Sequence, residues 1–401
     1  MGSNCRIGLL IERSRAFGRE LCEGVISYAQ DREWEIRYLA PDDLCGRRLA
    51  ECDGFIARVT TDGIARAFAA TRKPVVDVFY NLPNYGFSIV KARHESIGQL
   101  AAEHFIDRRF RNFAYCPYGS GKTSVDCRTA YAQHLRRAGF SCDVFASSSE
   151  IAYPSDSREI IGERIAAPRD ARALARWLRR LARPAAVFCP GDLRAWQVLA
   201  TCDRCGIRVP DEIAILGLDN DILICGGTHP MISSIDPNTR EIGRVAAETL
   251  ATLMTRPGRR PLVRQVEPAG VVARASTATY PLDPPWLSDA LIYIGRHAAD
   301  GISAADVLRL LGRSHTLVSR AFAKTLGTTV QREIARVRLE TACRLMRTTS
   351  LPLAEVAARA GFATYTYFMQ AFTAALKTPP GVWRTANAIT DDRHTRQKDP
   401  R

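Results

Sequence analysis

Two segments near the C-terminus carry hydrogen-bonding side chains on one face of an expected helix. In the segment 314–325, Val318 and Phe322 are four residues apart and are expected to face a core. The opposite face then carries His315, Thr316, Ser319 and Arg320. The Arg320 guanidinium can pair with O6 and N7 of guanine, which specifies a base, or it can touch phosphate, which positions without specifying. Both interpretations stay open.

The second segment, 364–376, has a less charged face. Its exposed positions are expected to be Tyr365, Thr366, Met369 and Gln370. Gln370 can pair with adenine, whereas Tyr365 is expected to touch the sugar-phosphate backbone or a thymine methyl group. Because few charges lie on this helix, we expect it to bind DNA less tightly than the first.

Both segments belong to one repeated pattern. The pattern consists of Val307, Gly312, Val318 and Phe322 in the first copy and of Val356, Gly361, Phe368 and Phe372 in the second. This spacing predicts a short helix, a turn at glycine and a second helix, which is the unit that enters a DNA major groove. A helix of about 27 Å is expected over 330–347 and would set the spacing of the two units. The sequence therefore predicts a sequence-specific DNA-binding protein.

The net charge is concentrated in the same part of the chain. The 401 residues carry a net charge of +14, and from Trp286 onward 17 Lys and Arg face 9 Asp and Glu. More than half of the positive excess thus lies in less than a third of the chain, which favours phosphate contacts there. Charge alone does not separate this interpretation from a generally arginine-rich composition.

The first 280 residues alternate apolar runs with helical patterns. Buried parallel strands are expected at 7–11, 54–57, 75–78, 113–116, 186–189 and 213–216. Helices are expected at 19–30, 96–107, 129–138, 171–181, 193–205 and 239–254. This alternation predicts an α/β fold of two lobes with doubly wound parallel sheets, and ligands of such sheets bind beyond the carboxyl ends of the strands.

Prolines mark the expected domain boundary. The run Tyr-Pro-Leu-Asp-Pro-Pro at 280–285 predicts a linker over 281–287, between a sensing domain at 1–280 and an all-α domain at 288–386. The polar residues 387–401 are expected to form a disordered tail.

An enzymatic function has little support in the residues. The loop 119–123, Gly-Ser-Gly-Lys-Thr, lacks the earlier glycine of a phosphate-binding loop, because Cys116 occupies that position. We expect a pocket-rim loop there, with a nucleotide-dependent enzyme or receptor as the alternative. No nucleophile–base constellation accompanies it, so no catalytic residue and no cofactor are expected. Cys202 and Cys205 form a lone CxxC pair without a histidine cluster, so no metal site is expected.

The N-terminal residues show no targeting signal. The apolar run 7–11 is too short for a signal peptide, and no stretch reaches the length of a transmembrane helix. Arg6 stands where myristoylation requires Ser or Thr. The twelve cysteines are scattered, as in proteins of a reducing compartment. We therefore expect a cytoplasmic protein with no membrane partner.

The C-terminal region closely resembles the AraC/XylS family of transcription regulators over about 288–384. The matching residues are Arg338, Leu339, Glu340 and Ala342, then Leu353, Glu355, Val356, Ala357, Gly361 and Phe362, and finally Tyr367, Phe368, Phe372, Pro380, Trp383 and Arg384. Lys377 departs from the family, which usually has glycine at that position. The resemblance implies double-stranded operator DNA and RNA polymerase as partners.

The N-terminal region resembles the LacI/GalR-type effector domain, which is related to periplasmic sugar-binding proteins. The resemblance rests on segments at 97–104, 191–195, 206–211, 216–220, 232–235 and 242–247. In that family the DNA-binding domain precedes the effector domain, whereas here the DNA-reading part follows it.

This second resemblance implies a pocket. Asp192 and Asp219 follow expected strands, and a carboxylate there suits paired sugar hydroxyls, although an Asp at a strand end also caps the following helix. Arg15 and Phe17 follow the first strand and would supply a donor and a ring for stacking. Arg128 stands where the family places an arginine that grips the ligand.

Arg93 replaces an acidic residue of many relatives. If Arg93 lies in the pocket beside Arg128, a sugar acid or sugar phosphate would fit better than a neutral sugar. The sequence thus predicts a ligand-responsive transcription regulator, an activator of a carbohydrate-use operon that works as a homodimer. In this mechanism the sugar closes the two lobes and re-orients the DNA readers.

Overall fold

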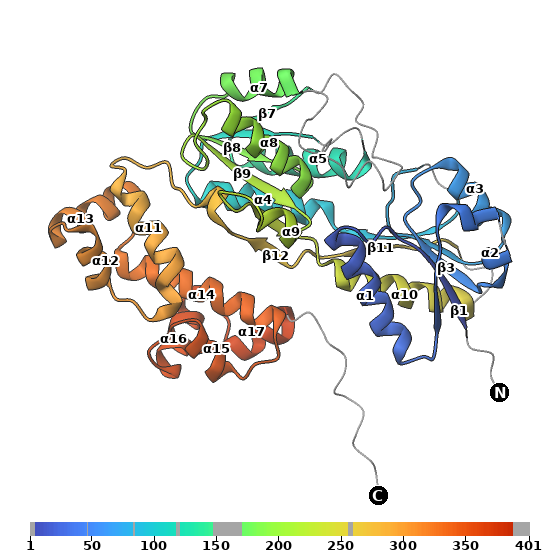
Figure 1. Cartoon of the computed structure of the whole chain (residues 1–401). Helices are drawn as coiled ribbons and strands as arrows, with labels where there is room; N and C mark the ends of the chain where they lie inside the picture. Colours follow the sequence, from blue (N-terminus) through green and yellow to red (C-terminus); the bar gives the residue numbers. More distant parts are fainter. Residues whose placement is uncertain are drawn as a thin grey trace, which may run out of the picture. The chain divides into compact units, whose positions relative to one another are not determined.

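The computed structural model describes residues 5–45, 47–82, 85–117, 121–146, 171–255 and 260–387. The chain divides into two compact units between Ala278 and Thr279. The first unit is α/β and the second is all-helical (Figure 1). Each unit has its own buried apolar clusters.

The described residues of the first unit form two six-stranded sheets. The first sheet has the order β11-β5-β4-β3-β1-β2 and consists of β1 (Arg6–Leu10), β2 (Glu35–Tyr38), β3 (Gly54–Ala57), β4 (Val75–Asp77), β5 (Ser88–Ala92) and β11 (Val263–Val266). The second has the order β12-β10-β9-β8-β6-β7 and consists of β6 (Asn112–Tyr115), β7 (Cys142–Val144), β8 (Ala185–Phe188), β9 (Ile213–Leu218), β10 (Ser233–Asp236) and β12 (Gly270–Val272). The described strands pair in parallel with their neighbours, except that β12 is antiparallel to β10. The predicted fold class is confirmed.

Helices flank both sheets, and two of them carry the chain from one sheet to the other. Helix α4 (His94–Asp107) follows β5 but packs on the second sheet beside α5 (Lys122–Arg137). Helix α10 (Thr239–Thr255) follows β10 but packs on the first sheet beside α1 (Ala16–Gln30). The other helices among the described residues of this unit are η1 (Pro41–Cys45), α2 (Arg47–Glu51), α3 (Asp62–Ala70), α7 (Ala171–Arg180), α8 (Asp192–Arg204), α9 (Ile222–Cys225) and η3 (Ala275–Thr277).

Glycines allow α1 and α10 to touch through their backbones. A Cβ atom on Gly24 would lie 1.9 Å from the carbonyl oxygen of Arg240, and one on Gly243 would lie 2.1 Å from that of Leu21. No side chain fits at either position, so these glycines fix the distance between the two helices.

The apolar runs identified the central strands but not the others. The predicted strands 54–57 and 213–216 lie within β3 and β9, whose residues are all buried. The strands β2, β5 and β11 were not predicted, because their side chains are only partly buried and do not form continuous apolar runs. The predicted helix 129–138 begins too late, since α5 already starts at Lys122.

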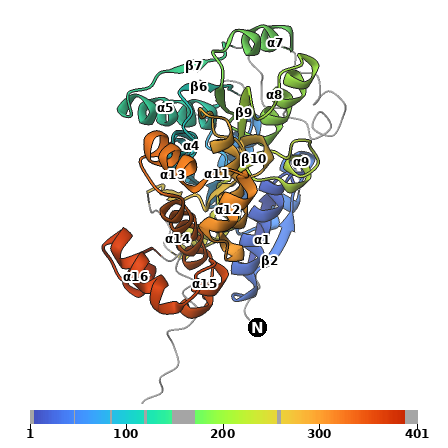
Figure 2. The same ribbon diagram turned by 90° about the vertical axis from the view of Figure 1, so that its left-hand side faces the viewer.

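The second unit consists of two groups of helices joined by one long helix. The elements are α11 (Trp286–His297), η4 (Ala298–Asp300), α12 (Ala304–Leu311), α13 (His315–Ala321), η5 (Phe322–Leu326), α14 (Val330–Thr348), α15 (Leu353–Arg359), α16 (Tyr365–Leu376) and α17 (Pro380–Asn387). Helix α14 runs between the groups (Figures 1 and 2). The predicted apolar pairs are buried, Val318 and Phe322 in one cluster and Phe368 and Phe372 in the other. Helix α13 is shorter than expected, because its last turn widens into the π-helical segment η5.

Helix α11 begins at Trp286, inside the expected linker. Prolines directly before a helix are compatible with its start, because the first N–H groups have no partner within the helix. The expected disordered tail lies outside the described residues, except for Asn387, which ends α17. Among the described residues no helix is both long and apolar enough to cross a membrane.

The turn glycine of the second copy is packed against the first group of helices. Gly361 has a φ of +84°, and a Cβ there would lie 2.4 Å from the carbonyl oxygen of Ala298. Arg338 on α14 donates to the same carbonyl at 2.9 Å and to that of Ile302 at 2.7 Å. The η4 turn therefore ties the two helix-turn-helix units together.

Candidate effector pocket and nucleic-acid interface

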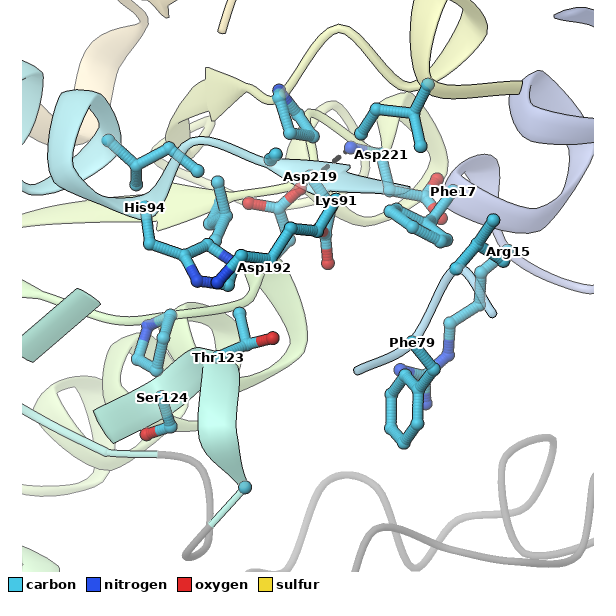
Figure 3. Close-up of a pocket in the computed structure, with 18 of the residues that line it drawn as sticks. Arg15, Phe17, Phe79, Lys91, His94, Thr123, Ser124, Asp192, Asp219 and Asp221 are labelled. Atoms are coloured by element: carbon cyan, nitrogen blue, oxygen red, sulfur yellow. Dashed lines mark hydrogen bonds between the residues drawn. The ribbon is translucent and has the colours of Figure 1, made fainter. Parts of the chain in front are cut away.

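A pocket in the first unit lies at the carboxyl ends of strands from both sheets (Figure 3). The side chains that carry polar or aromatic chemistry in its wall are Arg15, Phe17, Arg58, Phe79, Asn81, Lys91, His94, Thr123, Ser124, Asp192, Asp219 and Asp221. Parallel sheets place ligands at this edge, because the segments that follow the strands converge there.

Four of the six predicted effector residues line this pocket, namely Arg15, Phe17, Asp192 and Asp219. Arg93 does not, because its Nη1 pairs with Glu267 Oε1 at 2.8 Å and half of its side chain is exposed. Arg128 does not either, since α5 begins six residues earlier and leaves Arg128 on an exposed face. The expectation of a cationic site built on these two arginines is therefore corrected.

Asp192 is the most deeply buried acid of the pocket wall. It is 1% exposed, its Oδ1 accepts from Ser234 Oγ at 2.5 Å and its Oδ2 accepts from the backbone N of Asp221 at 2.7 Å. Burial raises the pKa of Asp192 to about 7 although both hydrogen bonds oppose the shift. Burial, and then the nearby Asp192 carboxylate, also raise the pKa of Asp219 well above its usual range.

Contacts beside the pocket join elements of the two sheets. Asp221, after β9, accepts from the backbone N of Ala16 at 2.9 Å, at the start of α1. Asn81, after β4, accepts from the backbone N of Lys122 at 2.7 Å, at the start of α5. The two lobes thus meet through hydrogen bonds from backbone donors at helix N-termini.

Lys91 and His94 form a second polar wall that the sequence did not reveal. Lys91 Nζ lies 3.4 Å from Asp126 Oδ2 and 4.0 Å from the centre of the Tyr80 ring. His94 Nδ1 lies 3.1 Å from the same Asp126 oxygen, and burial lowers its pKa. Both residues were missed because β5 was not recognised as a strand. On the other side, the Arg58 guanidinium lies 4.5 Å from the centre of the Phe79 ring.

The arrangement suits a small ligand with many hydroxyl groups. The carboxylates can accept hydrogen bonds, the cationic side chains and Asn81 can donate, and the rings of Phe17 and Phe79 offer apolar faces. The wall thus combines three cationic side chains, Arg15, Arg58 and Lys91, with three acids, of which Asp192 and Asp219 have raised pKa values. Among the described residues no cluster of His, Cys, Asp and Glu could hold a metal ion.

The raised pKa of Asp192 predicts a stability that falls with rising pH. Between its ordinary value of 3.8 and about 7, the folded state binds a proton that the unfolded state has lost, so stability declines by up to about 1.4 kcal/mol per pH unit. Urea unfolding of the ligand-free protein at pH 5 and pH 8 measures this decline. Asp192→Asn should flatten the profile, and an unchanged profile in this variant would show that Asp192 does not titrate in this range.

The two predicted DNA-reading helices present most of the expected side chains to solvent. Each begins at a capping hydroxyl, Ser314 for α13 and Thr364 for α16. The exposed predicted residues are His315, Thr316, Arg320, Tyr365, Thr366 and Gln370. Ser319 and Met369 are half-buried, and Met369 packs against the second apolar cluster. Leu317 and Tyr367 also lie on these faces and are 45% and 47% exposed. They were not among the predicted DNA-binding residues, because large apolar side chains are usually expected to be buried.

The two reading helices are repeats offset by 50 residues. The offset relates Ser314 to Thr364, and Phe322 to Phe372. It also relates Gly327 to Lys377, which both adopt a left-handed conformation with φ of +65° and +57°. The turn therefore keeps its geometry although the second copy has lost the usual glycine.

Lys122 of the glycine-rich loop starts α5, and its Nζ lies 4.0 Å from the centre of the Tyr80 ring. Gly119 and Ser120 lie outside the described residues. Cys202 and Cys205 are free thiols in and after α8, and burial raises the pKa of Cys202 to about 12. A thiol with a raised pKa is a poor nucleophile and a poor metal ligand.

Comparison with known proteins agrees with this division of the chain. Residues 102–277 match the periplasmic binding protein-like domain, and residues 307–386 match a helix-turn-helix domain. The xylose operon regulatory protein of Escherichia coli K12 is 27% identical over 96% of this chain and 97% of its own length. The protein of that name from Haemophilus influenzae is 23% identical over 94% and 98%. A solved xylose-binding transcription activator is 25% identical and covers 96% of this chain and 99% of its own, with a TM-score of 0.58.

The fold, the pocket and the paired helix-turn-helix units define a DNA-binding transcription regulator with a ligand-sensing domain. The chain carries a periplasmic binding protein-like domain ahead of a helix-turn-helix domain of the AraC type, and it is similar over nearly its whole length to xylose operon regulatory proteins.

Proposed function

We propose that the protein controls transcription of carbohydrate-use genes in response to a neutral sugar, and that the sugar is a pentose such as D-xylose. The observation that carries this proposal is the pocket with Asp192 and Asp219 at adjacent strand ends, in the same chain as two DNA-reading helices. The names of its relatives support the ligand class. The expectation of a sugar acid rested on Arg93 and Arg128, which lie outside the pocket, so the neutral sugar in the names of the relatives is taken as the ligand.

The full-length chain is the material for the test. DNA sites are first selected from a random library with the purified protein, and affinity for the selected site is then measured with and without D-xylose. The same measurement is made with two acidic compounds, D-xylonate and D-xylose 5-phosphate. A change in DNA affinity with D-xylose alone supports the proposal, whereas a response to the acidic compounds alone would overturn the neutral-sugar assignment.

The proposal extends to partners and place. A regulator of this kind acts on chromosomal DNA in the cytoplasm, as a homodimer that contacts RNA polymerase when it activates. Sedimentation of the full chain with operator DNA, and transcription in a purified system, test these points. A nucleotide-dependent enzyme is not favoured, since Lys122 Nζ lies on the Tyr80 ring.

We expect Arg320→Ala to weaken binding to the selected site. Arg320 is exposed on α13, and the loss of a forked contact to guanine costs about 1–3 kcal/mol, or roughly 5–150-fold in affinity. The loss of affinity is measured by competition binding with the selected site and with a set of sites that each carry one changed base pair.

Two further variants decide what Arg320 contacts. Arg320→Lys keeps the charge but loses the fork, so it restores binding only if the contact is to phosphate. Arg309→Ala is the matched control, because Arg309 is an exposed arginine of the same unit that pairs with Asp306. An equal loss in the Arg309 and Arg320 variants would contradict a specific contact.

A further inference from the structure

A continuous series of hydrogen bonds leads from the pocket to the last residues of the sensing unit. It begins at Asp192 in the pocket wall and ends at Thr277, two residues before Thr279, the first residue of the second unit. The side chains of Asp192, Ser233, Ser234 and Thr277 are at most 1% exposed. Such buried polar groups are costly unless each is satisfied, so their arrangement is tightly specified.

At the pocket end, one hydroxyl connects the acid to the loop that follows β9. Ser234 Oγ donates to Asp192 Oδ1 at 2.5 Å and accepts from the backbone N of Asn220 at 3.0 Å. The same hydroxyl has a second acceptor, the carbonyl oxygen of Ile235, at 3.5 Å. A ligand hydroxyl that occupies Asp192 Oδ1 would therefore displace the Ser234 proton towards another acceptor already within reach.

In the middle, Arg274 connects three segments. Its Nη2 donates to Asn220 Oδ1 at 2.7 Å, its Nη1 donates to the carbonyl oxygen of Ile232 at 2.9 Å, and its backbone N donates to Ser233 Oγ at 2.7 Å. A movement of the Asn220 loop thus acts directly on the segment that leads out of the sensing unit.

At the exit end, the direction of each hydrogen bond follows from the chemistry of the partners. Arg108 can only donate, so His104 Nδ1, 3.0 Å from Arg108 Nη1, accepts. His104 Nε2 then donates to Thr277 Oγ1 at 3.0 Å, which leaves the Thr277 hydroxyl to donate to Ser233 Oγ at 2.7 Å. Burial lowers the pKa of His104 well below its usual range, in keeping with a neutral ring.

We propose that these hydrogen bonds transmit occupancy of the pocket to the start of the DNA-binding unit, with the Ser233–Thr277 hydroxyl pair as the last step. The inference rests on the proposed function, since it assumes an effector at Asp192. Ser276 secures the same segment, because its Oγ donates to the carbonyl oxygen of Ile215 at 2.6 Å and accepts from the backbone N of Ser233 at 2.8 Å. The η3 turn is thereby held to β9 and β10, so a shift of these strands reaches Thr277.

The test uses Thr277→Val and Ser233→Ala in the full chain, with Thr249→Val as the matched control. Thr249 is an equally buried threonine whose hydroxyl donates to the carbonyl oxygen of Val245 within α10, outside the series. D-xylose affinity is measured by calorimetry, and DNA affinity is measured with and without D-xylose. In coupled proteins such ligand effects are on the order of 5–150-fold.

We expect the Thr277 and Ser233 variants to bind D-xylose within about threefold of the wild type, while its effect on DNA affinity falls below about twofold. The control keeps the full effect. A variant that binds D-xylose and still responds fully would overturn the inference.

If D-xylose does not bind, only the assignment of the sugar is refuted. Transmission along the hydrogen bonds is then tested by a measurement on the ligand-free protein. Asparagine at position 192 can accept only one of the two hydrogen bonds from Ser234 and Asp221, so Asp192→Asn should speed amide hydrogen exchange of residues 274–278 severalfold. The acceleration should disappear in the double variant with Thr277→Val. Unchanged exchange in Asp192→Asn, or equal acceleration in both backgrounds, would contradict transmission along this series.

Discussion

Gly361→Ala is expected to destabilise the DNA-binding unit by about 3 kcal/mol or more and to abolish specific DNA binding. Two effects add at this position. The φ of +84° is unfavourable for any residue with a Cβ, and that Cβ would lie 2.4 Å from the carbonyl oxygen of Ala298 and 2.8 Å from Ala299 Cα. Backbone atoms of the η4 turn cannot move away without breaking the hydrogen bonds from Arg338.

Gly312→Ala is the natural control, because Gly312 is the turn glycine of the first copy. It has a φ of +58°, but no atom lies within 4 Å of a Cβ built there. This variant should be destabilised only by the unfavourable backbone conformation, by about 1 kcal/mol. Calorimetric unfolding of both variants separates strain from packing. An equal loss of stability in both variants would show that the η4 turn does not hold the second helix-turn-helix unit in place.

Gly24→Ala is expected to destabilise the sensing unit by a similar amount, about 3 kcal/mol or more. The new methyl carbon would lie 1.9 Å from the carbonyl oxygen of Arg240, so α1 and α10 must separate. Ile242 on α10 and Phe17 on α1 both line the pocket, and we therefore expect effector affinity to fall as well. Chemical unfolding and ligand titration of the variant measure the two effects.

Gly63→Ala tests whether the effect comes from packing. Gly63 lies in the first turn of α3, and its nearest contact for a Cβ is Thr61 Oγ1 at 3.8 Å. Alanine should therefore raise stability by up to about 1 kcal/mol through helix propensity. A loss in Gly63→Ala as large as in Gly24→Ala would mean that general helix effects, not the contact between α1 and α10, govern the result.

The sequence predicted the strands that are buried on both faces, since only these form uninterrupted apolar runs. β10 was not predicted, because Ser233 and Ser234 interrupt the apolar run. Both residues are nevertheless fully buried, since their hydroxyl groups form hydrogen bonds within the protein. The missing strands carried pocket residues with them, as Lys91 shows. Local pattern does not encode which distant segment will supply a partner.

Arg93 illustrates the limit for single residues. Its position just after β5 was compatible with the pocket edge, yet β5 pairs with β11, which arrives some 170 residues later in the chain and brings Glu267 beside Arg93. The reading helices were predicted more accurately, because the core residues Val318, Phe322, Phe368 and Phe372 fix which face is exposed. Function was therefore easier to foresee at the C-terminal end, where contacts are local.

The 50-residue repeat has a consequence for the DNA itself. Two identical subunits related by a twofold axis read a palindrome, which is the same in both orientations. In this chain the corresponding positions differ, with Arg320 in one reader where Gln370 stands in the other. The DNA site that one chain reads is accordingly asymmetric. Reversing this site relative to a promoter therefore reverses the orientation of the bound chain relative to that promoter.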